Sequence, residues 1–271
     1  MAEVLLRTDR LNRFFGGLHA VDDVSFAVER GMIKAVIGPN GAGKTTLFNL
    51  IAGALAPSSG RVFWREQNIT GGRPHAIARA GIARTFQNTR LFPHMSVLEN
   101  VMVGRHPRTG CGFIAGMLNL PQTWREERRI RERAGQILEE LGLAALADDL
   151  AGNLAFGKQR LVEFARALAT EPELLLLDEP AAGLNMHETD ELSELILRIR
   201  SQGVTCLVVE HDMSLVMRVS DEVLVLDQGR QIAQGPPREI QRNPDVIRIY
   251  LGEEGAEPDG TEAKREGGGH A

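Results

Sequence analysis

The sequence predicts an α/β fold with a mainly parallel sheet. In the C-terminal half, short and wholly apolar segments alternate with amphipathic ones. Apolar strands that alternate with amphipathic helices are typical of a parallel sheet with both faces covered. The expected strands are 173–178, 204–210 and 222–227, and the expected helices are 158–170, 187–201 and 213–219.

A second observation supports the same fold class in the N-terminal half. The apolar run MIKAVIG (32–38) is followed by a glycine-rich loop and then by LFNLIAGAL. In the latter segment Leu47, Leu50, Ile51 and Ala54 have the spacing of one helix face. The order strand, glycine loop, helix is that of a βα unit in a parallel sheet.

The flanking segments complete the predicted elements. The alternation over 24–29 predicts a half-buried strand, and Pro57–Gly60 predicts a turn before a short strand at RVFW. Ser96 and Glu99 form a capping-box pattern that opens a helix. We expect a loop over 105–120 and a charged helix over 122–141, with one apolar stripe made of Ile130, Ala134, Ile137, Leu138 and Leu141.

Composition excludes several classes of protein. The 271 residues are 43% hydrophobic and 25% charged, with a net charge of −5, which argues against a disordered chain and against a dedicated nucleic-acid binder. There is no signal-peptide pattern and no apolar run of bilayer length, and the two cysteines are expected to be free thiols. These features predict a cytoplasmic protein. Residues 253–271 are acidic and glycine-rich and are expected to be a disordered tail.

The clearest motif is a phosphate-binding loop. Residues 38–45 read GPNGAGKT and fit the pattern G-x-x-x-x-G-K-[ST]. Glycines let successive backbone N–H groups point at an anion, and the helix that follows adds its positive end. Lys44 is expected to reach the β- and γ-phosphates, and Thr45 to bind Mg²⁺. The expected nucleotide-binding residues of this loop are Gly38, Pro39, Asn40, Gly41, Ala42, Gly43, Lys44, Thr45 and Thr46.

Two carboxylates follow the leucine strand at 174–177. Asp178 and Glu179 stand where ligands bind in open α/β sheets, at the carboxyl end of a strand. Asp178 is expected to hold Mg²⁺, directly or through water, and Glu179 to polarise the attacking water. A solvated acidic pair at a strand end is common in α/β proteins, but the phosphate loop in the same chain favours the catalytic interpretation.

Further segments occur in a recognisable order along the chain. Gln87 lies in RTFQNTRLF, the sequence LAFGKQR (154–160) precedes an amphipathic helix, AAGLN (181–185) follows the acids, and His211 lies in VVEHDM. Together with the phosphate loop, these segments resemble the ATP-binding subunits of ABC transporters across nearly the whole of 4–252. The resemblance implies a P-loop NTPase core with an N-terminal antiparallel β subdomain and an α-helical insertion at about 90–170, in one domain spanning 1–252.

The resemblance implies a role for each matching position. Phe15 matches the aromatic residue that stacks on adenine, and Gln87 matches the glutamine that senses Mg²⁺ and the γ-phosphate and faces the membrane partner. His211 matches the switch histidine at the γ-phosphate. Ala155, Gly157 and Lys158 belong to the signature segment, which contacts ATP held by the opposite subunit, and the loop 181–185 crosses the dimer interface.

Three departures from the usual motifs narrow the resemblance. Ala155 replaces the usual signature serine, Lys158 the usual glutamine and Asn185 the usual aspartate of the interface loop. The serine-less signature and the Asn185 position resemble the larger ATPase subunit of branched-chain amino-acid importers. That resemblance implies ATP and Mg²⁺ as cofactors, a second ATPase subunit, two membrane permeases and a solute-binding protein as partners, and a place on the cytoplasmic face of the cell membrane.

Alternatives remain open at this point. Urea and short-amide importers and the lipopolysaccharide exporter have related ATPases. A soluble ABC ATPase acting on nucleic acid usually has two cassettes, a long coiled coil or zinc-binding cysteines, and this chain has none of these, so we expect no nucleic-acid partner. A GTPase would show an N-K-x-D motif, which is absent. No histidine or cysteine cluster has the spacing of a transition-metal site.

Overall fold

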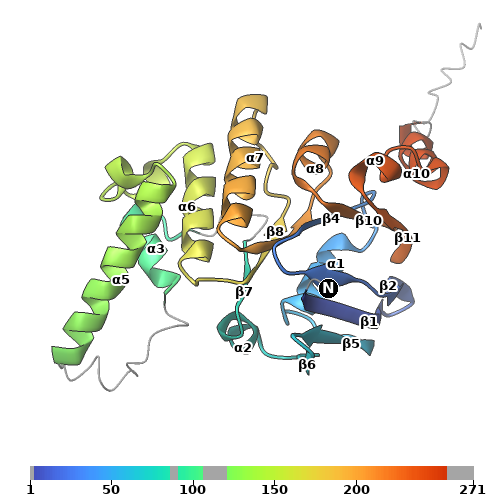
Figure 1. Cartoon of the computed structure of the whole chain (residues 1–271), viewed down its shortest axis with the longest axis horizontal. Helices are drawn as coiled ribbons and strands as arrows, with labels where there is room; N and C mark the ends of the chain where they lie inside the picture. Colours follow the sequence, from blue (N-terminus) through green and yellow to red (C-terminus); the bar gives the residue numbers. More distant parts are fainter. Residues whose placement is uncertain (1–2, 86–90, 106–120, 255–271) are drawn as a thin grey trace, which may run out of the picture.

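The computed structural model describes residues 3–85, 91–105 and 121–254. Two sheets and a group of helices make up this part of the chain (Figure 1). In this view the antiparallel sheet lies below the parallel sheet, helices α3, α5 and α6 gather at the left, and α9 and α10 lie at the right.

The N-terminal sheet is antiparallel, as the resemblance implied. Its strands are β1 (Val4–Phe15), β2 (Leu18–Val24), β3 (Ala27–Glu29), β5 (Ser59–Trp64) and β6 (Gln67–Asn68). The order is β2-β1-β5-β6, and β3 also pairs with β1. The single strand expected over 24–29 is wrong: β2 ends at Val24, and β3 starts at Ala27. Between them, Phe26 exchanges hydrogen bonds with Thr8 of β1, and this places the bend.

The second sheet carries the predicted parallel strands. It contains β4 (Ile33–Ile37), β7 (Ile82–Arg84), β8 (Leu174–Asp178), β9 (Thr205–Val209), β10 (Glu222–Asp227) and β11 (Arg230–Gly235). The order is β11-β10-β4-β9-β8-β7, and only β11 runs antiparallel to its neighbour. The α/β fold class predicted from the alternating pattern is confirmed.

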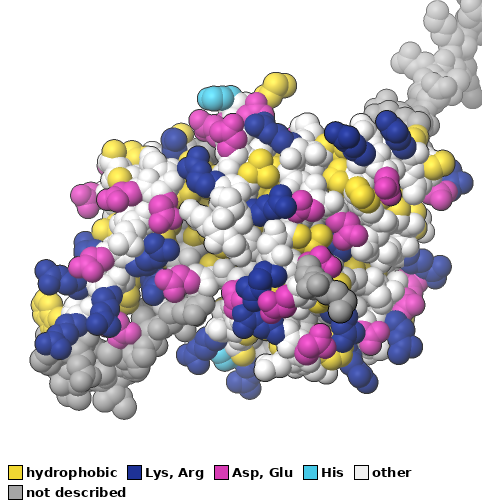
Figure 2. All heavy atoms as spheres, in the orientation of Figure 1, with side chains coloured by type: hydrophobic (Ala, Val, Ile, Leu, Met, Phe, Trp, Pro, Cys, Tyr) yellow, Lys and Arg dark blue, Asp and Glu magenta, His cyan; other side chains and the backbone are white. Residues whose placement is uncertain are grey.

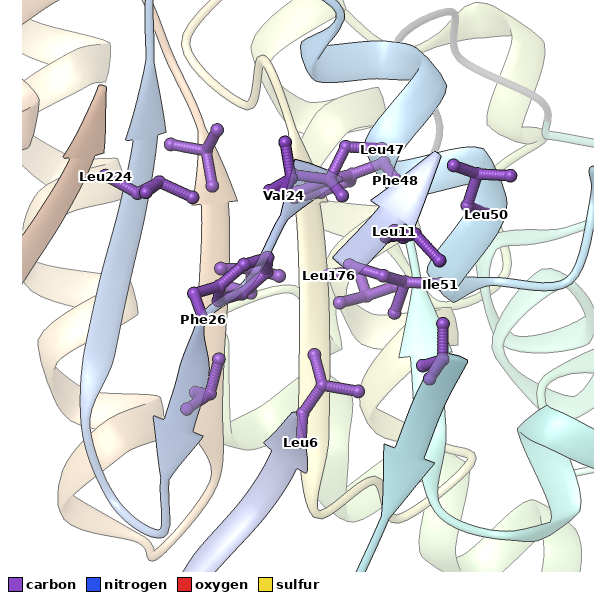
Figure 3. Packing of buried hydrophobic residues seen from close by; sticks show 14 of the residues in the cluster. Leu6, Leu11, Val24, Phe26, Leu47, Phe48, Leu50, Ile51, Leu176 and Leu224 are labelled. Atoms are coloured by element: carbon purple, nitrogen blue, oxygen red, sulfur yellow. The ribbon is translucent and has the colours of Figure 1, made fainter. Parts of the chain in front are cut away.

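Both faces of the parallel sheet are buried, which explains the wholly apolar strands. Leu174 and Leu176 of β8 face a cluster that joins both sheets to α1 (Lys44–Ile51), shown in Figure 3. Leu175 and Leu177 face the other side, where they pack under α6 (Phe156–Leu168), α7 (Met186–Ser201) and α8 (Met213–Val219). Helix α1 ends at Ile51, so Ala54 lies beyond the helix that its spacing predicted.

Helices connect β7 to β8. After α2 (Pro74–Arg79) and β7, the chain forms α3 (Val97–Val103), α5 (Pro121–Glu140), two short 3-10 turns (Ala144–Leu146 and Ala151–Asn153) and α6. The capping box is confirmed: the Ser96 side chain accepts from Glu99 N, and Glu99 Oε2 accepts from Ser96 N. Helices α3, α5 and α6 share an apolar cluster. The loop expected over 105–120 lies outside the described residues from 106 onward.

The C-terminal helices are α9 (Pro237–Ile240) and α10 (Pro244–Glu254). Helix α10 runs two residues into the segment expected to be disordered, and 255–271 lie outside the described residues. Within the part of the chain that the structure describes, no helix combines the length and the apolar character that crossing a membrane requires.

Cys206 lies fully buried on β9, and burial raises the pKa of its thiol to about 12. Because the thiolate is the reactive form, Cys206 should resist alkylation at pH 7 to 9 while the chain is folded. We expect peptide mapping to find it unmodified by iodoacetamide in native protein and modified after unfolding in guanidinium. Rapid labelling of native protein at Cys206 would contradict the buried position. Cys111 lies outside the described residues.

Candidate functional site

The phosphate loop leaves the buried strand β4 and enters α1. Gly38 and Gly43 have φ values of 151° and 95°, in the region that side chains disfavour. A Cβ atom at Gly38 would lie 2.0 Å from Leu226 O, and one at Gly43 would lie 2.2 Å from Ala20 O. Backbone conformation and close approach therefore both require glycine at these two positions.

Lys44 is folded back over this loop. Its side chain is buried, and Nζ donates to Gly38 O at 2.5 Å and to Pro39 O at 2.8 Å. The ammonium is thus held beside the N-terminus of α1, whose first turn carries no acidic residue. A fixed cation and a helix N-terminus form an anion site, as the motif predicts. Thr45 is exposed and Thr46 is half-buried at the start of the same helix.

Strand register brings the other motif residues to the same edge of the sheet. Val36 of β4 pairs with Val209 of β9, and Val209 also pairs with Asp178 of β8. Beyond that row, Glu179 N donates to Val209 O, and His211 lies two residues after Val209. The loop, the acid pair and the histidine thus lie at the carboxyl ends of three adjacent parallel strands.

Asp178 is a buried carboxylate with one oxygen paired and one unpaired. Oδ2 accepts from Arg84 Nη2 at 2.7 Å, and Arg84 Nη1 donates to Asn49 Oδ1 on α1 at 2.7 Å. Oδ1 is buried and has no hydrogen-bond partner among the described residues. A carboxylate oxygen is the ligand type that Mg²⁺ prefers, so the position of this one fits a cation beside the phosphate loop.

Glu179 has a strained backbone. Its φ is 45°, which is uncommon for a residue other than glycine, and its side chain is half-buried. Arg160 of α6 donates to the Glu179 carbonyl at 2.7 Å. The guanidinium of Arg160 is itself buried, although arginine on a helix is usually exposed. The sequence predicted the carboxylate but not the arginine that holds its backbone.

Glu210 connects the acid pair to the histidine. This fully buried carboxylate accepts from Ala181 N at 2.8 Å through Oε1, and from His211 N at 2.9 Å and Asp212 N at 3.2 Å through Oε2. The His211 side chain is 62% exposed, so it is free to meet a ligand above the sheet edge. Sequence reasoning missed Glu210, although a carboxylate at the end of a wholly apolar strand was a visible signal.

The signature segment forms the start of α6. Ala155 is its N-cap and makes no side-chain capping bond, and Ala155 and Lys158 are exposed. Gly157 lies in the first turn with an ordinary helical backbone, and a Cβ there would lie 2.5 Å from Glu188 Oε1. Asn185 caps α7 and forms a capping box with Glu188, so its departure from aspartate keeps a side chain that can cap.

Phe15 ends β1 and is 42% exposed. The Arg13 guanidinium lies 4.6 Å from its ring centroid, whereas the neighbouring Phe14 stacks on His19 at 3.9 Å. The β1–β2 hairpin also lies against the phosphate loop, since Ala20 O limits the space at Gly43. An exposed aromatic ring beside the loop is thus available on this hairpin. Gln87 lies within 86–90, outside the described residues.

A groove of about 600 Å³ opens between the helical segment and the sheets. Its lining is mainly apolar, with Ile77, Phe92 and Val103 on its walls, and it includes the charged residues Glu163 and Arg166. Arg84, the partner of Asp178, also lines it. The groove therefore reaches from the surface to a residue that touches the candidate cation ligand.

The surface carries charges of both signs. Figure 2 shows acidic and basic side chains interspersed over the face that it draws, including along α5 at the lower left.

Among the described residues, no group of three or more His, Cys, Asp or Glu side chains is arranged to hold a metal ion.

Comparisons with known proteins identify the family of this chain. A family model described as ABC transporter matches residues 21–182, and a second, described as branched-chain amino acid ATP-binding cassette transporter, matches 230–256. The chain is 47% identical over 254 residues to the high-affinity branched-chain amino acid transport ATP-binding protein BraF of Pseudomonas aeruginosa and to LivG of Salmonella typhimurium. Each alignment covers 93% of this chain and 100% of the relative.

A crystal structure of an ATP-binding cassette of an ABC transporter in its ADP conformation has the same fold. It is 34% identical, with a TM-score of 0.81, and the match covers 92% of this chain and 99% of that one. The family match spans the phosphate loop and the acid pair. The chain therefore belongs to the ATP-binding cassette family of ABC transporters and is a nucleotide-binding ATPase.

Proposed function

We propose that this chain is the ATP-hydrolysing subunit of an importer for branched-chain amino acids. One observation carries the ATPase activity: the phosphate loop, Asp178, Glu179 and His211 meet at one edge of the sheet. The importer class is supported by the 47% identity to BraF and LivG and by the match of 230–256 to the branched-chain model. Related urea or amide importers and the lipopolysaccharide exporter are the alternatives.

The proposed residue roles follow from their positions. Lys44, the loop 38–46 and the positive end of α1 bind the phosphates, and Phe15 stacks on adenine. Thr45, Gln87 and Asp178 would hold Mg²⁺, which neutralises charge on the β- and γ-phosphates when it is bound.

Hydrolysis requires a positioned water and a stabilised γ-phosphate. Glu179 polarises the attacking water and takes its proton. His211 and Gln87 complete the γ-phosphate site. Because phosphoryl transfer depends mainly on positioning and charge, the strained backbone at Glu179 and the buried Glu210 serve the reaction by fixing geometry.

The chain works with partners at the membrane. Two ATPase subunits sandwich two ATP molecules, each between one phosphate loop and the opposite signature segment, which includes Ala155, Gly157 and Lys158. The groove between α2, α3 and α6 is suited to receive a segment of a permease, since it is apolar and reaches Arg84. Two permeases, a solute-binding protein and a place on the cytoplasmic face of the membrane complete the proposed assembly.

The experiment that tests this function is purification of the chain with its native complex. We expect two permeases and a solute-binding protein to co-purify. ATP turnover of the complex in vesicles should rise when that binding protein carries leucine, isoleucine or valine. Stimulation by urea or short amides instead, or co-purification with lipopolysaccharide-export proteins, would assign one of the alternatives.

Substitutions at Ala155 test the sandwich. Asp and Ser are both good N-caps, so either residue should preserve α6. Ala155→Ser should change turnover only mildly, since one neutral hydrogen bond contributes about 0.5–1.5 kcal/mol. Ala155→Asp should nearly stop turnover of the assembled complex, because its carboxylate would face the γ-phosphate across a dry interface. ATP binding by the isolated subunit should survive in both variants. Normal turnover of Ala155→Asp would show that the signature segment does not face the γ-phosphate.

Gly157→Asp should also nearly stop ATP turnover of the assembled complex. From the sequence, one expected reason for this loss is that aspartate lacks the backbone freedom of glycine. That reason is wrong, because the φ of Gly157 is not in the left-handed region. The structural reason is space and charge: any Cβ meets Glu188 Oε1 at 2.5 Å, and a carboxylate adds repulsion from Glu188. Gly157→Ala, which adds the contact without the charge, is the matched control and should be the milder of the two.

A further inference from the structure

Arg160 is a buried cation in contact with residues 178–181, the catalytic loop that carries Glu179. From the first turns of α6, its Nε donates to Pro180 O at 3.2 Å, and its Nη2 donates to Glu179 O at 2.7 Å and to Asp178 O at 3.4 Å. Its Nη1 donates to Glu163 Oε2 at 3.0 Å, and both side chains of this ion pair are almost fully buried. One guanidinium therefore contacts three successive backbone carbonyls on both sides of Glu179.

The loop that it holds does not rest in a relaxed conformation. Glu179 has a φ of 45°, and such a backbone persists only where surrounding contacts determine it. Arg160 supplies contacts from α6, and Glu210, the residue after β9, supplies one by accepting from Ala181 N. The loop is thus fixed between a buried cation and a buried anion that come from different elements.

Only an arginine can make this set of contacts. Its planar guanidinium carries several donors in fixed directions, whereas the lysine ammonium is a single point of charge. Glu163 neutralises the guanidinium and orients it from one helical turn away on α6. None of these groups has to touch nucleotide for the arrangement to matter, because a small displacement of a catalytic group lowers the rate.

We propose that Arg160 is a positioning residue for hydrolysis. It sets the direction of the Glu179 carboxylate by holding the backbone carbonyls of 178–180, and Glu163 keeps it in place. The inference rests on the proposed function, in which Glu179 polarises the water. Arg160 acts on the chemical step and leaves ATP binding to the phosphate loop. Since α6 begins at the signature segment, the helix that serves the partner's ATP also holds the catalytic loop of its own subunit.

The test uses the complete transporter complex with two variants of this chain. Arg160→Lys keeps a buried positive charge beside Glu163. Arg160→Met combined with Glu163→Met removes both charges of this ion pair together, because removing one alone would leave the other buried without its partner. The same change also takes Glu163 from Arg166, whose Nη2 lies 4.0 Å from Glu163 Oε1. Arg248→Met is the matched control, because Arg248 is 77% exposed on α10 and lies outside the proposed machinery. Turnover, the KM for ATP, ATP binding and thermal unfolding are measured for each.

We expect the double variant to lower kcat by about tenfold to 100-fold with the KM for ATP nearly unchanged. Arg160→Lys should fall between it and wild type, since an ammonium reaches fewer of the carbonyls. Both variants should accumulate a closed, ATP-bound dimer, which a loss of general stability would not produce. Arg248→Met should behave as wild type.

Other outcomes overturn the proposal. A wild-type kcat in either folded variant shows that Arg160 does not position Glu179 for hydrolysis. Loss of ATP binding or of the unfolding transition in both variants shows that Arg160 serves the fold instead. Glu179→Gln, measured in parallel, separates the two levels of inference: if it turns over ATP normally, the proposed role of Glu179 fails, whereas a slow Glu179→Gln beside normal Arg160 variants overturns this inference alone.

Discussion

Lys44→Ala should abolish tight ATP binding. The ammonium lies over the phosphate loop at the start of α1, and hydrogen bonds to charged groups contribute about 1.5–3 kcal/mol each. Losing contacts to two phosphates should therefore raise the Kd for ATP at least about 100-fold. Titration of the isolated subunit with a fluorescent ATP analogue, followed by isothermal calorimetry with ATP, measures this directly.

The matched control is Lys158→Ala. Lys158 is exposed at the signature segment, and its proposed contact is to the partner's nucleotide, so the isolated subunit should bind ATP with wild-type affinity. Because Lys44 also donates to Gly38 O and Pro39 O, thermal unfolding of Lys44→Ala must be recorded beside its binding. Wild-type affinity in a folded Lys44→Ala variant would overturn the assignment of the phosphate loop.

Glu179→Gln should bind ATP normally but stall before hydrolysis. Glutamine keeps the shape of the side chain but cannot take the proton of the attacking water, so turnover should fall by about 10²- to 10⁴-fold. With ATP still bound and not consumed, the closed dimer should accumulate, and size-exclusion chromatography or crosslinking across the dimer would detect it.

The control is Glu194→Gln, since Glu194 is an exposed carboxylate on α7 that pairs with Arg218. It should hydrolyse ATP as the wild type does. Near-normal turnover of Glu179→Gln in the purified complex would point to another base, and the buried Glu210 and the exposed His211 would be the next groups to test.

Much of the fold could be predicted because local patterns were clear. The expected strand 222–227 and helix 213–219 match β10 and α8 as observed, and the expected helix 187–201 differs from α7 by one residue at its start. These elements lie in a sheet with two covered faces, so their apolar periodicity directly reflects burial.

The N-terminal sheet was harder to predict. Strand β1 spans twelve residues and pairs with three different strands, but its register shifts between Leu11 and Arg13 and between Asp9 and Asn12. A bulge breaks the two-residue alternation that would reveal a strand. The opposite occurs over 24–29, where the alternation of buried residues continues although the strand is interrupted by a bend that the contact with β1 explains.

The sequence by itself determined the chemistry of this protein. The phosphate loop, the acid pair after a leucine strand and the histidine after the next strand are local patterns, and with the family resemblance their residue types predict nucleotide and cation binding without any knowledge of tertiary contacts. Only the tertiary structure decided what fixes these groups in place. Arg84, Arg160 and Glu210 reach partners 94, 19 and 29 residues away along the chain. Such contacts depend on strand register and on the packing of α6 against the sheet, whereas periodicity reports only which face of an element is buried.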